Sequence, residues 1–338
     1  MAASARAQTL ADGVRRRDRR ALAKAITLVE STRRDDQADA QRLLELLLPE
    51  TGGAARIGVT GVPGVGKSTF IEAFGLHLIG QGKRVAVLAV DPSSALSGGS
   101  ILGDKTRMPR LAAAPEAFIR PSPSAGSFGG VTRRTREAIL VCEAAGHDVV
   151  VVETVGVGQS EFAVASMVDF FLVLLLPGAG DELQGIKKGI VELADALAVN
   201  KADGDNITRA SQAAAEYRGA LGLFRHTPLW EPPVLTVSAL EGRGMDQVWA
   251  VVEDHRRKLG PALADKRRDQ QRAWFWSMIR DGLERQFLAR DDVARLLPEM
   301  EDAVASSALT PTEAARRLLA LLGDGGKGGV RPARKRTA

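Results

Sequence analysis

Short apolar runs alternate with helix-length segments through the middle of the chain. Seven of these runs are four to seven residues long and rich in aliphatic residues, a pattern typical of strands buried on both faces of a parallel sheet. They cover residues 57–60, 84–90, 117–120, 149–153, 170–176, 197–200 and 234–238. Because the helical segments between them imply right-handed crossovers, the pattern predicts an α/β fold with a mainly parallel, doubly wound sheet. In such a sheet, ligands bind at the carboxyl ends of the strands.

The chain before residue 53 has a helical pattern and no strand pattern. Apolar positions recur at helical spacing there, which predicts an N-terminal helical extension over residues 1–52. Thr9 and Asp18 are candidate N-caps of its helices. The arginine-rich stretch 15–20 contains the candidate cap Asp18 and has further acidic residues nearby, so we interpret it as a solvated helical face rather than a nucleic-acid site.

A second helical region follows residue 245. Segment 272–288 carries more large apolar side chains than one solvent-facing helix needs. They are Trp274, Phe275, Trp276, Met278, Ile279, Leu283 and Phe287. This density indicates a surface for a partner or for a second copy of the chain, and packing onto the N-terminal helices is the alternative.

A glycine-rich loop follows the first predicted strand and precedes a helical segment. It fits the pattern G-x-x-x-x-G-K-[ST] and consists of Gly61, Val62, Pro63, Gly64, Val65, Gly66, Lys67, Ser68 and Thr69. The glycines let backbone N–H groups converge on a polyphosphate, and the helix N-terminus adds a favourable dipole. We expect Lys67 to reach the β- and γ-phosphates and the Ser68 hydroxyl to ligate Mg²⁺. The loop therefore predicts nucleoside triphosphate binding, with a plain glycine turn as the alternative.

Two carboxylates stand at the ends of predicted strands near this loop. Asp91 could hold Mg²⁺ through water or polarise the attacking water, or it could cap a turn formed with Pro92. Glu153 ends a strand of four consecutive valines, and a buried carboxylate there is costly unless it faces Mg²⁺ or a salt-bridge partner. We expect Ser68, Asp91 and Glu153 to form the metal site, and Lys67, Asp91 and Glu153 to take part in catalysis.

The sixth predicted strand ends in Asn200-Lys201-Ala202-Asp203, which matches the N-K-x-D pattern for guanine. The Asp203 carboxylate can accept hydrogen bonds from N1–H and the 2-amino group of guanine. Adenine offers neither group at that edge, and a buried polar group left unpaired is costly. The Lys201 stem can lie along the base, and Asn200 can tie this loop to the phosphate loop. The segment Ser238, Ala239 and Leu240 follows the next strand as the expected backing loop for guanine, so the predicted ligand is GTP.

A loop with four glycines and four charged residues covers residues 177–189. It follows a buried strand, so we expect either a mobile functional loop or a simple connector. Lys187 and Lys188 are cations in it that partner binding could bring towards the nucleotide, and we expect Lys188 to be a catalytic residue. Gln159 lies three positions after Gly156 rather than directly after it, so no water-positioning role is assigned to it.

Composition narrows the function further. The chain has 338 residues and one cysteine, Cys142, which excludes an internal disulfide. No apolar run has the roughly 18 residues of a membrane span, and no signal-like segment opens the chain, so we expect a cytoplasmic protein with no membrane partner. Five of the 46 basic residues lie after residue 326, and the 41 that remain equal the 41 acidic residues. With a near-neutral body, we expect no nucleic-acid partner.

These features divide the sequence into four parts. We expect an N-terminal helical extension at 1–52, a GTPase domain at 53–258 and a C-terminal helical arm for dimerisation or partner binding at 259–322. Residues 323–338 are glycine-rich and then basic, which predicts a disordered tail.

Together the motifs resemble those of the methylmalonyl-CoA mutase-associated GTPases, which are MeaB/ArgK-type proteins of the SIMIBI class of P-loop NTPases. The matching stretches are 61–69, 90–94, 97–108, 153–159, 177–189 and 200–203. The resemblance implies a homodimeric GTPase chaperone for an adenosylcobalamin-dependent mutase. Such a protein gates cofactor delivery from an adenosyltransferase, protects the mutase from inactivation and does not itself hold cobalamin. It also implies switch loops at 97–108 and 153–159, and a third at 177–189 that senses the mutase.

Two other enzyme functions share the phosphate loop. A P-loop kinase is disfavoured because the N-K-x-D pattern selects guanine and kinases mostly use ATP. A metallochaperone GTPase delivering nickel would need a His/Cys cluster near the nucleotide, and the chain has four histidines and one cysteine with no such cluster.

Overall fold

The computed structural model describes residues 5–91, 107–123, 128–154, 160–178, 188–221 and 229–323. Contacts divide the chain into two compact units, Met1–Gln270 and Gln271–Ala338. The first unit holds the sheet, and the described part of the second is helical. The four sequence-based domain boundaries stay a prediction.

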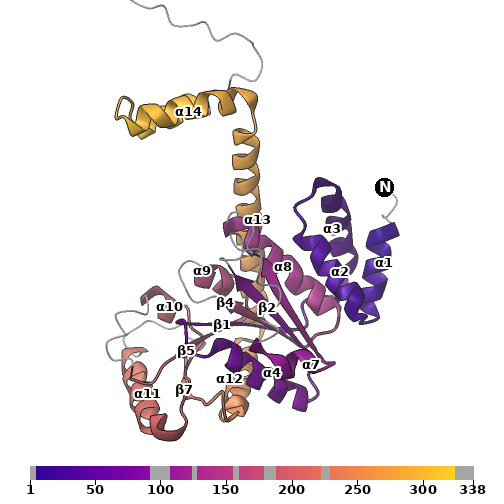
Figure 1. Cartoon of the computed structure of the whole chain (residues 1–338), viewed down its shortest axis with the longest axis vertical. Coiled ribbons are helices and arrows are strands. Elements are labelled where there is room, and N and C mark those ends of the chain that lie inside the picture. Colours follow the sequence, from indigo (N-terminus) through magenta and orange to yellow (C-terminus); the bar gives the residue numbers. More distant parts are fainter. Residues whose placement is uncertain are drawn as a thin grey trace, which may run out of the picture. The chain divides into compact units, whose positions relative to one another are not determined.

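Seven parallel strands form the sheet of the first unit, as the sequence predicts (Figure 1). They are β1 (Ala55–Gly61), β2 (Val85–Asp91), β3 (Ala117–Pro123), β4 (Val149–Thr154), β5 (Phe170–Leu175), β6 (Ala196–Val199) and β7 (Val234–Thr236). Their order is β3-β2-β4-β1-β5-β6-β7, and every neighbouring pair is parallel. The chain moves from β1 to one edge, returns at β4 and continues from β5 to the other edge. The sheet is therefore doubly wound, with its switch point beside β1.

Helices cover both faces of this sheet (Figure 1). The helices in the described part of the first unit are α1 (Ala5–Arg15), α2 (Arg19–Glu30), α3 (Arg34–Leu47), α4 (Lys67–Gly80), α7 (Pro109–Ala113), α8 (Phe128–Ala144), α9 (Ser160–Ala165), α10 (Lys188–Glu192), α11 (Ile207–Leu221) and α12 (Met245–Leu259), with 3₁₀ turns η1 (Leu48–Glu50) and η2 (Gly204–Asn206). The next helix, α13 (Pro261–Leu288), begins in this unit and ends in the second.

Alternate strand residues point into two hydrophobic cores. Val150 and Val152 of β4 pack into the core that includes buried side chains of α1, α2, α3, α8, α9 and α11. Val149 and Val151 pack into the other core, with buried side chains of α4, α7 and α12. Both faces of β4 are thus covered, which explains its unbroken run of valines.

Two local predictions differ from the structure. Thr9 is not an N-cap, because α1 begins at Ala5 and the Thr9 hydroxyl donates to the Ala5 carbonyl at 2.7 Å within the helix. Asp18 does cap α2, accepting from the backbone N–H groups of Arg20 and Ala21 at 2.7 and 3.3 Å. The third strand is longer than predicted and runs to Pro123. It lies at the edge of the sheet, where a proline that lacks an N–H group is tolerated.

Buried ion pairs hold the first turns of α13 against the amino-terminal ends of the strands. The Arg267 guanidinium donates to both carboxylate oxygens of Asp169, at 2.7 and 2.6 Å. Asp169 also accepts from the backbone N–H of Arg56, whose guanidinium donates to both oxygens of Glu143 at 2.9 and 2.8 Å. These bonds join segments that are far apart in the sequence.

The second unit contains the rest of α13, followed by α14 (Asp291–Ala305) and α15 (Pro311–Ala320). Phe275, Trp276 and Leu283 are 60%, 58% and 62% exposed. Large apolar side chains are seldom exposed together, so the predicted partner or dimer surface on this part of α13 stays a prediction.

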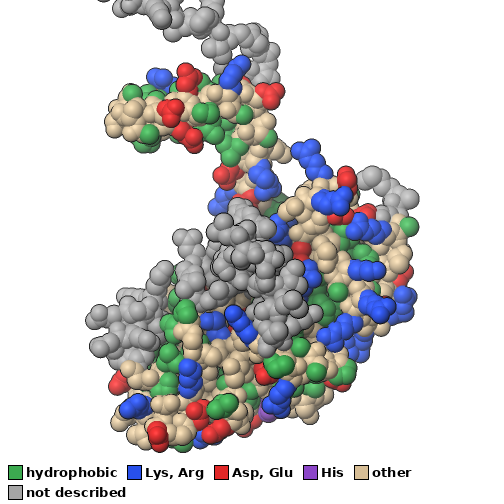
Figure 2. Space-filling model, in the orientation of Figure 1, with side chains coloured by type: hydrophobic (Ala, Val, Ile, Leu, Met, Phe, Trp, Pro, Cys, Tyr) green, Lys and Arg blue, Asp and Glu red, His purple; other side chains and the backbone are tan. Residues whose placement is uncertain are grey.

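One face of the first unit carries charges of both signs. On the face shown in Figure 2, Lys and Arg side chains are interspersed with Asp and Glu, in keeping with the near-neutral body. Among the described residues, no helix is both long enough and apolar enough to cross a membrane.

Candidate nucleotide-binding site

The glycine-rich loop lies at the switch point of the sheet. It joins Gly61, the last residue of β1, to Lys67, the first residue of α4 (Figure 1). β1 is flanked by β4 and β5, with Val59 in register with Glu153 and Gly61 in register with Leu174. The first four N–H groups of a helix have no acceptor within the helix. The N-terminus of α4 therefore offers donors and the positive end of its dipole to a phosphate.

Two glycines are required by the geometry of this loop. Gly61 has φ 150°, and a Cβ there would lie 2.5 Å from the carbonyl oxygen of Leu174. Gly66 has φ 93° and precedes the first turn of α4, and a Cβ there would lie 2.9 Å from Nδ2 of Asn200. Any side chain at either position would displace a neighbouring strand or the guanine loop.

Lys67 is folded back onto the loop. Its ammonium donates to the carbonyl oxygens of Gly61 and Val62, at 2.8 and 3.3 Å. Burial lowers the pKa of Lys67, and the nearby carboxylates of Glu153 and Glu161 oppose that shift. A half-buried cation held beside the loop can neutralise a polyphosphate.

Ser68 and Glu153 meet at the carboxyl ends of β1 and β4. The Ser68 hydroxyl donates to Oε1 of Glu153 at 3.0 Å, and the Glu153 side chain is buried. A hydroxyl and a carboxylate next to a phosphate loop are the oxygen donors that Mg²⁺ prefers, with water and phosphate oxygens completing its octahedron. The residues present therefore fit a Mg²⁺ ion bound together with a nucleotide.

Asn200 links the predicted guanine loop to the phosphate loop. Its Nδ2 donates to the carbonyl oxygen of Val65 at 2.8 Å, and its Oδ1 accepts from the backbone N–H of Ala239 at 3.1 Å. Asn200 is 1% exposed, so both bonds are shielded from water. One buried side chain thus joins three loops.

Asp203 is held by the backing loop. The Ser238 hydroxyl donates to Oδ2 of Asp203 at 2.6 Å, and Arg243 donates to the Ala202 carbonyl at 2.8 Å. These contacts orient the carboxylate while leaving Oδ1 able to accept from a base. Nearby, the Leu240 side chain is 81% exposed, and Lys201 is an exposed non-glycine residue with φ 58°.

Several expected site residues lie wholly or partly outside the described residues. Asp91 ends β2 next to β4, and Lys188 begins α10, but their side chains are not described. Of the expected switch segments 97–108, 153–159 and 177–189, residues 97–106, 155–159 and 179–187 are not described either. Arg107, at the end of the first of these, is a cation close enough to lower the pKa of Lys67.

Two features of the site are not predicted from the sequence motifs. Thr154 donates to Thr60 at 2.7 Å, a buried bond that joins β4 to β1 behind the phosphate loop. Glu161, in the first turn of α9, is 3% exposed and within electrostatic range of Lys67. The only sequence signal for Glu161 is its place shortly after the Glu153 strand end, and that does not reveal its burial.

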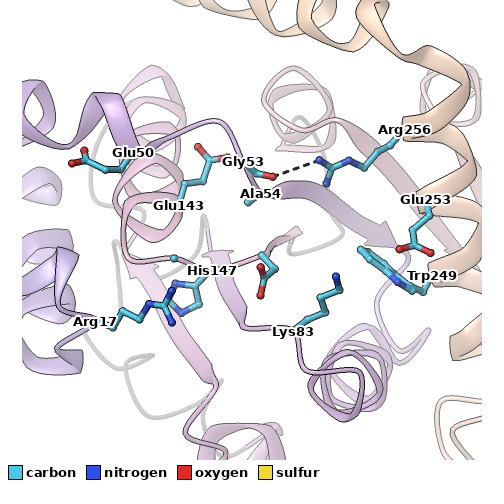
Figure 3. Close-up of a pocket in the computed structure, with 12 residues that line it drawn as sticks. Arg17, Glu50, Gly53, Ala54, Lys83, Glu143, His147, Trp249, Glu253 and Arg256 are labelled. Atoms are coloured by element: carbon cyan, nitrogen blue, oxygen red, sulfur yellow. Dashed lines mark hydrogen bonds between the residues drawn. The ribbon is translucent and has the colours of Figure 1, made fainter.

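A separate cavity of about 600 Å³ lies at the opposite end of the strands (Figure 3). Gly53 and Ala54 border it just before β1, and Lys83 borders it just before β2. Glu143, one of the carboxylates that line it, is paired with Arg56. Because the phosphate loop is at the carboxyl ends of the strands, this cavity is not part of the nucleotide site.

Comparisons with known proteins show which family the chain resembles. A family model described as "Methylmalonyl Co-A mutase-associated GTPase MeaB" matches residues 22–292. The GTPase ArgK of Escherichia coli is 49% identical over 316 residues, which cover 92% of this chain and 96% of that protein. The mitochondrial methylmalonic aciduria type A homolog of Mus musculus is 48% identical over 320 residues, covering 91% of this chain and 77% of that protein. A crystal structure of an LAO/AO transport system kinase matches with a TM-score of 0.77 and 41% identity, covering 96% of this chain and 99% of that one.

Proposed function

The chain belongs to the methylmalonyl-CoA mutase-associated GTPase family and is a P-loop GTPase, and we propose that it acts as a GTP-hydrolysing chaperone of an adenosylcobalamin-dependent methylmalonyl-CoA mutase. In this role it binds the mutase, gates the loading of the cobalamin cofactor and protects the mutase from inactivation. The adenosyltransferase that supplies the cofactor is an indirect partner. Cobalamin itself is not held by this chain, and the protein acts in the cytoplasm.

The observation that carries the nucleotide part of the proposal is the Asn200 link. Asn200 bonds to Val65 in the phosphate loop and to Ala239 in the backing loop. Binding of a guanine base against Asp203 is thereby coupled mechanically to the loop that holds the phosphates. This coupling supports GTP as the ligand, because a base that cannot satisfy Asp203 also disturbs phosphate binding.

Different residues of the site would bind the phosphates, the metal ion and the base during GTP hydrolysis. The N–H groups of the phosphate loop and the Lys67 ammonium bind the phosphates and offset the charge that develops as the γ-phosphate leaves. Ser68, Glu153 and Asp91 would hold Mg²⁺, which when bound neutralises phosphate charge and orients the phosphate oxygens. Leu240 and the Lys201 stem would cover the base.

A contact between α9 and α10 supports the gating part of the proposal. The Phe162 ring of α9 lies against Gly189 of α10, so close that a Cβ on Gly189 would be 3.0 Å from Phe162 Cζ. α9 comes shortly after Glu153 in the chain, and α10 begins at the end of the 177–189 segment. A movement that starts at the γ-phosphate can therefore pass to α10, where Lys188 would respond to the mutase.

The exposed apolar face of α13 supports a homodimer. Phe275, Trp276 and Leu283 are large apolar side chains that are exposed to water, which is unfavourable. Aromatic residues of this kind anchor protein–protein interfaces. We therefore assign this part of the arm to a second copy of the chain. No nucleic-acid or membrane partner is proposed.

A kinase is the second candidate function, since one solved relative carries that name. It is disfavoured because Asp203, whose carboxylate accepts a hydrogen bond from Ser238, belongs to an N-K-x-D pattern that favours guanine, whereas kinases mostly use ATP. A metallochaperone is also disfavoured. Within the described part of the chain, Cys142 is fully buried with a raised pKa, and His147 is buried and bonded to the Cys142 carbonyl.

Nucleotide-dependent co-purification with the mutase tests the proposal. The chain, loaded with GDP or with a non-hydrolysable GTP analogue, is passed over immobilised mutase, with ATP analogues as the matched control. We expect retention that depends on the guanine nucleotide state and is unaffected by ATP analogues. Retention independent of nucleotide, or phosphate transfer from ATP to an acceptor, would contradict it.

A further inference from the structure

Glu161 is a buried carboxylate at the edge of the nucleotide site. Its side chain lies in the first turn of α9 and the residue is 3% exposed. Within the described part of the chain, its Oε2 atom is shielded from solvent and has no hydrogen-bond partner, and no residue forms an ion pair with it. An ionised carboxylate in this state is unfavourable unless a cation or a donor is supplied to it.

The packing of α9 places this carboxylate beside the phosphate loop. Val164 of α9 lies against Gly58 of β1, where an added Cβ would be 2.9 Å from its side chain. Gly58 is three residues before Gly61, where the phosphate loop begins. The charge of Glu161 also acts on the Lys67 ammonium without forming an ion pair with it. Glu161 is therefore within electrostatic range of the phosphate loop without being paired to its lysine.

Two structural roles fail to account for Glu161. An acidic residue in a first helical turn can cap backbone N–H groups, but no such bond from a described residue reaches Oε2 of Glu161. A buried acid can also serve as half of an ion pair. Glu143 and Glu137 do so with Arg56 and Arg133, at 2.8 and 3.0 Å. Glu161 has no such arginine among the described residues.

We propose that Glu161 is a positioning residue for Mg²⁺, accepting a hydrogen bond from a water molecule in the coordination shell of the metal. The inference rests on the proposed GTP-binding function and extends the Ser68–Glu153 site by one carboxylate. Mg²⁺ keeps several waters when it binds with a nucleotide, and carboxylates commonly hold those waters in place. A carboxylate next to a polyphosphate is repelled unless a cation lies between them, which favours a role towards the metal over one towards the phosphate itself.

The test measures Mg²⁺ binding rather than turnover. Binding of a fluorescent GDP analogue is titrated with Mg²⁺ for wild type, Glu161→Gln and Glu161→Ala, and is repeated in EDTA. Glu137→Gln is the matched control, because Glu137 is also 3% exposed but lies on α8 and is paired with Arg133. Thermal unfolding of each variant checks that it is folded.

We expect both Glu161 variants to need about 10- to 100-fold more Mg²⁺ for half-maximal binding, the usual effect of losing a group that holds a metal's ligand. In EDTA their GDP affinity should equal or exceed that of wild type, since a negative charge near the phosphates has been removed. Glu137→Gln should match wild type in both conditions.

An unchanged Mg²⁺ requirement in folded Glu161→Gln and Glu161→Ala would overturn the proposal. So would an equal loss of GDP affinity with and without Mg²⁺, which would mark a purely structural role. Failure of the wild-type protein to bind guanine nucleotides would instead contradict the proposed GTPase function. The experiment therefore distinguishes a wrong role for Glu161 from a wrong function for the protein.

Discussion

The Asn200 side chain donates a hydrogen bond to the Val65 carbonyl at 2.8 Å, across 135 residues of sequence. It passes so close to Gly66 that any side chain there would collide with it. The predicted guanine loop and the phosphate loop are therefore joined by a buried hydrogen bond.

Replacing Asn200 with alanine should weaken guanine nucleotide binding. The change leaves the Ala239 N–H and the Val65 carbonyl without their partner, and unsatisfied buried groups cost about 1–3 kcal/mol. We expect about 10- to 100-fold weaker binding of both GDP and GTP in calorimetry. Asn206→Ala, in the nearby turn η2, is the control and should bind as wild type does. Unchanged affinity in Asn200→Ala would show that the two loops are independent.

Asp203→Asn should change the base preference. The amide presents a donor where guanine needs an acceptor, so GTP binding should weaken, whereas xanthosine triphosphate has a 2-oxo group that accepts a hydrogen bond. Competition between the two nucleotides measures the switch, with the exposed Asp205→Asn as control. Equal binding of ATP and GTP by the wild type would contradict the guanine assignment.

Arg267→Ala should destabilise the first unit. Asp169 is 1% exposed, and removing its guanidinium partner would leave a buried charge, at a cost of about 3–5 kcal/mol. Urea unfolding followed by tryptophan fluorescence measures the loss. The exposed Arg268→Ala is the neighbouring control, and a loss in Arg267→Ala no larger than in this control would contradict the prediction.

The same pair predicts an acid dependence. Burial alone would raise the pKa of Asp169, but the Arg267 guanidinium and the Arg56 N–H outweigh it and hold the pKa below its usual value. A carboxyl group whose pKa is lower in the folded state stabilises fully above its unfolded pKa, near 3.9, and loses that contribution as the pH falls through the folded value. Wild type should therefore lose this stability below about pH 4, and Arg267→Ala should lose less over the same range.

Features encoded locally in the sequence could be predicted, and features created by tertiary contacts could not. The phosphate loop and the N-K-x-D loop carry their own residue patterns, and the strands carry continuous apolar runs. The burial of Glu161 depends on how α9 packs over Gly58, and the Arg267–Asp169 pair joins residues 98 positions apart. The third strand is predicted to end at residue 120 because Pro121 and Pro123 follow it. The sequence does not reveal that this strand lies at an edge of the sheet, where prolines are tolerated.

Lys188→Ala should reduce any acceleration of hydrolysis by the mutase. No glutamine directly follows Gly156, so the chain has no obvious water-positioning residue of its own, and a cation supplied by the 177–189 segment would compensate. We expect normal GTP binding with a smaller response to the mutase. Glu192→Ala, an exposed change on α10, is the control. If the mutase still stimulated hydrolysis in Lys188→Ala, Lys187→Ala and Gln184→Ala alike, the 177–189 segment would not carry its effect, and the prediction would be wrong.

GTP turnover by the wild-type protein, with and without the mutase, tests the proposed function most directly. Alone, a GTPase without a supplied cation hydrolyses GTP at on the order of 10⁻⁴ to 10⁻² s⁻¹, and a positioned cation adds up to about 10³- to 10⁵-fold. We expect slow intrinsic turnover, a clear rise when the mutase is added, and neither in Lys67→Ala. By linkage, the nucleotide that the complex favours should tighten mutase binding by the same factor. Turnover that is unaffected by the mutase, together with mutase binding that is indifferent to GDP and GTP, would contradict the gated-chaperone function.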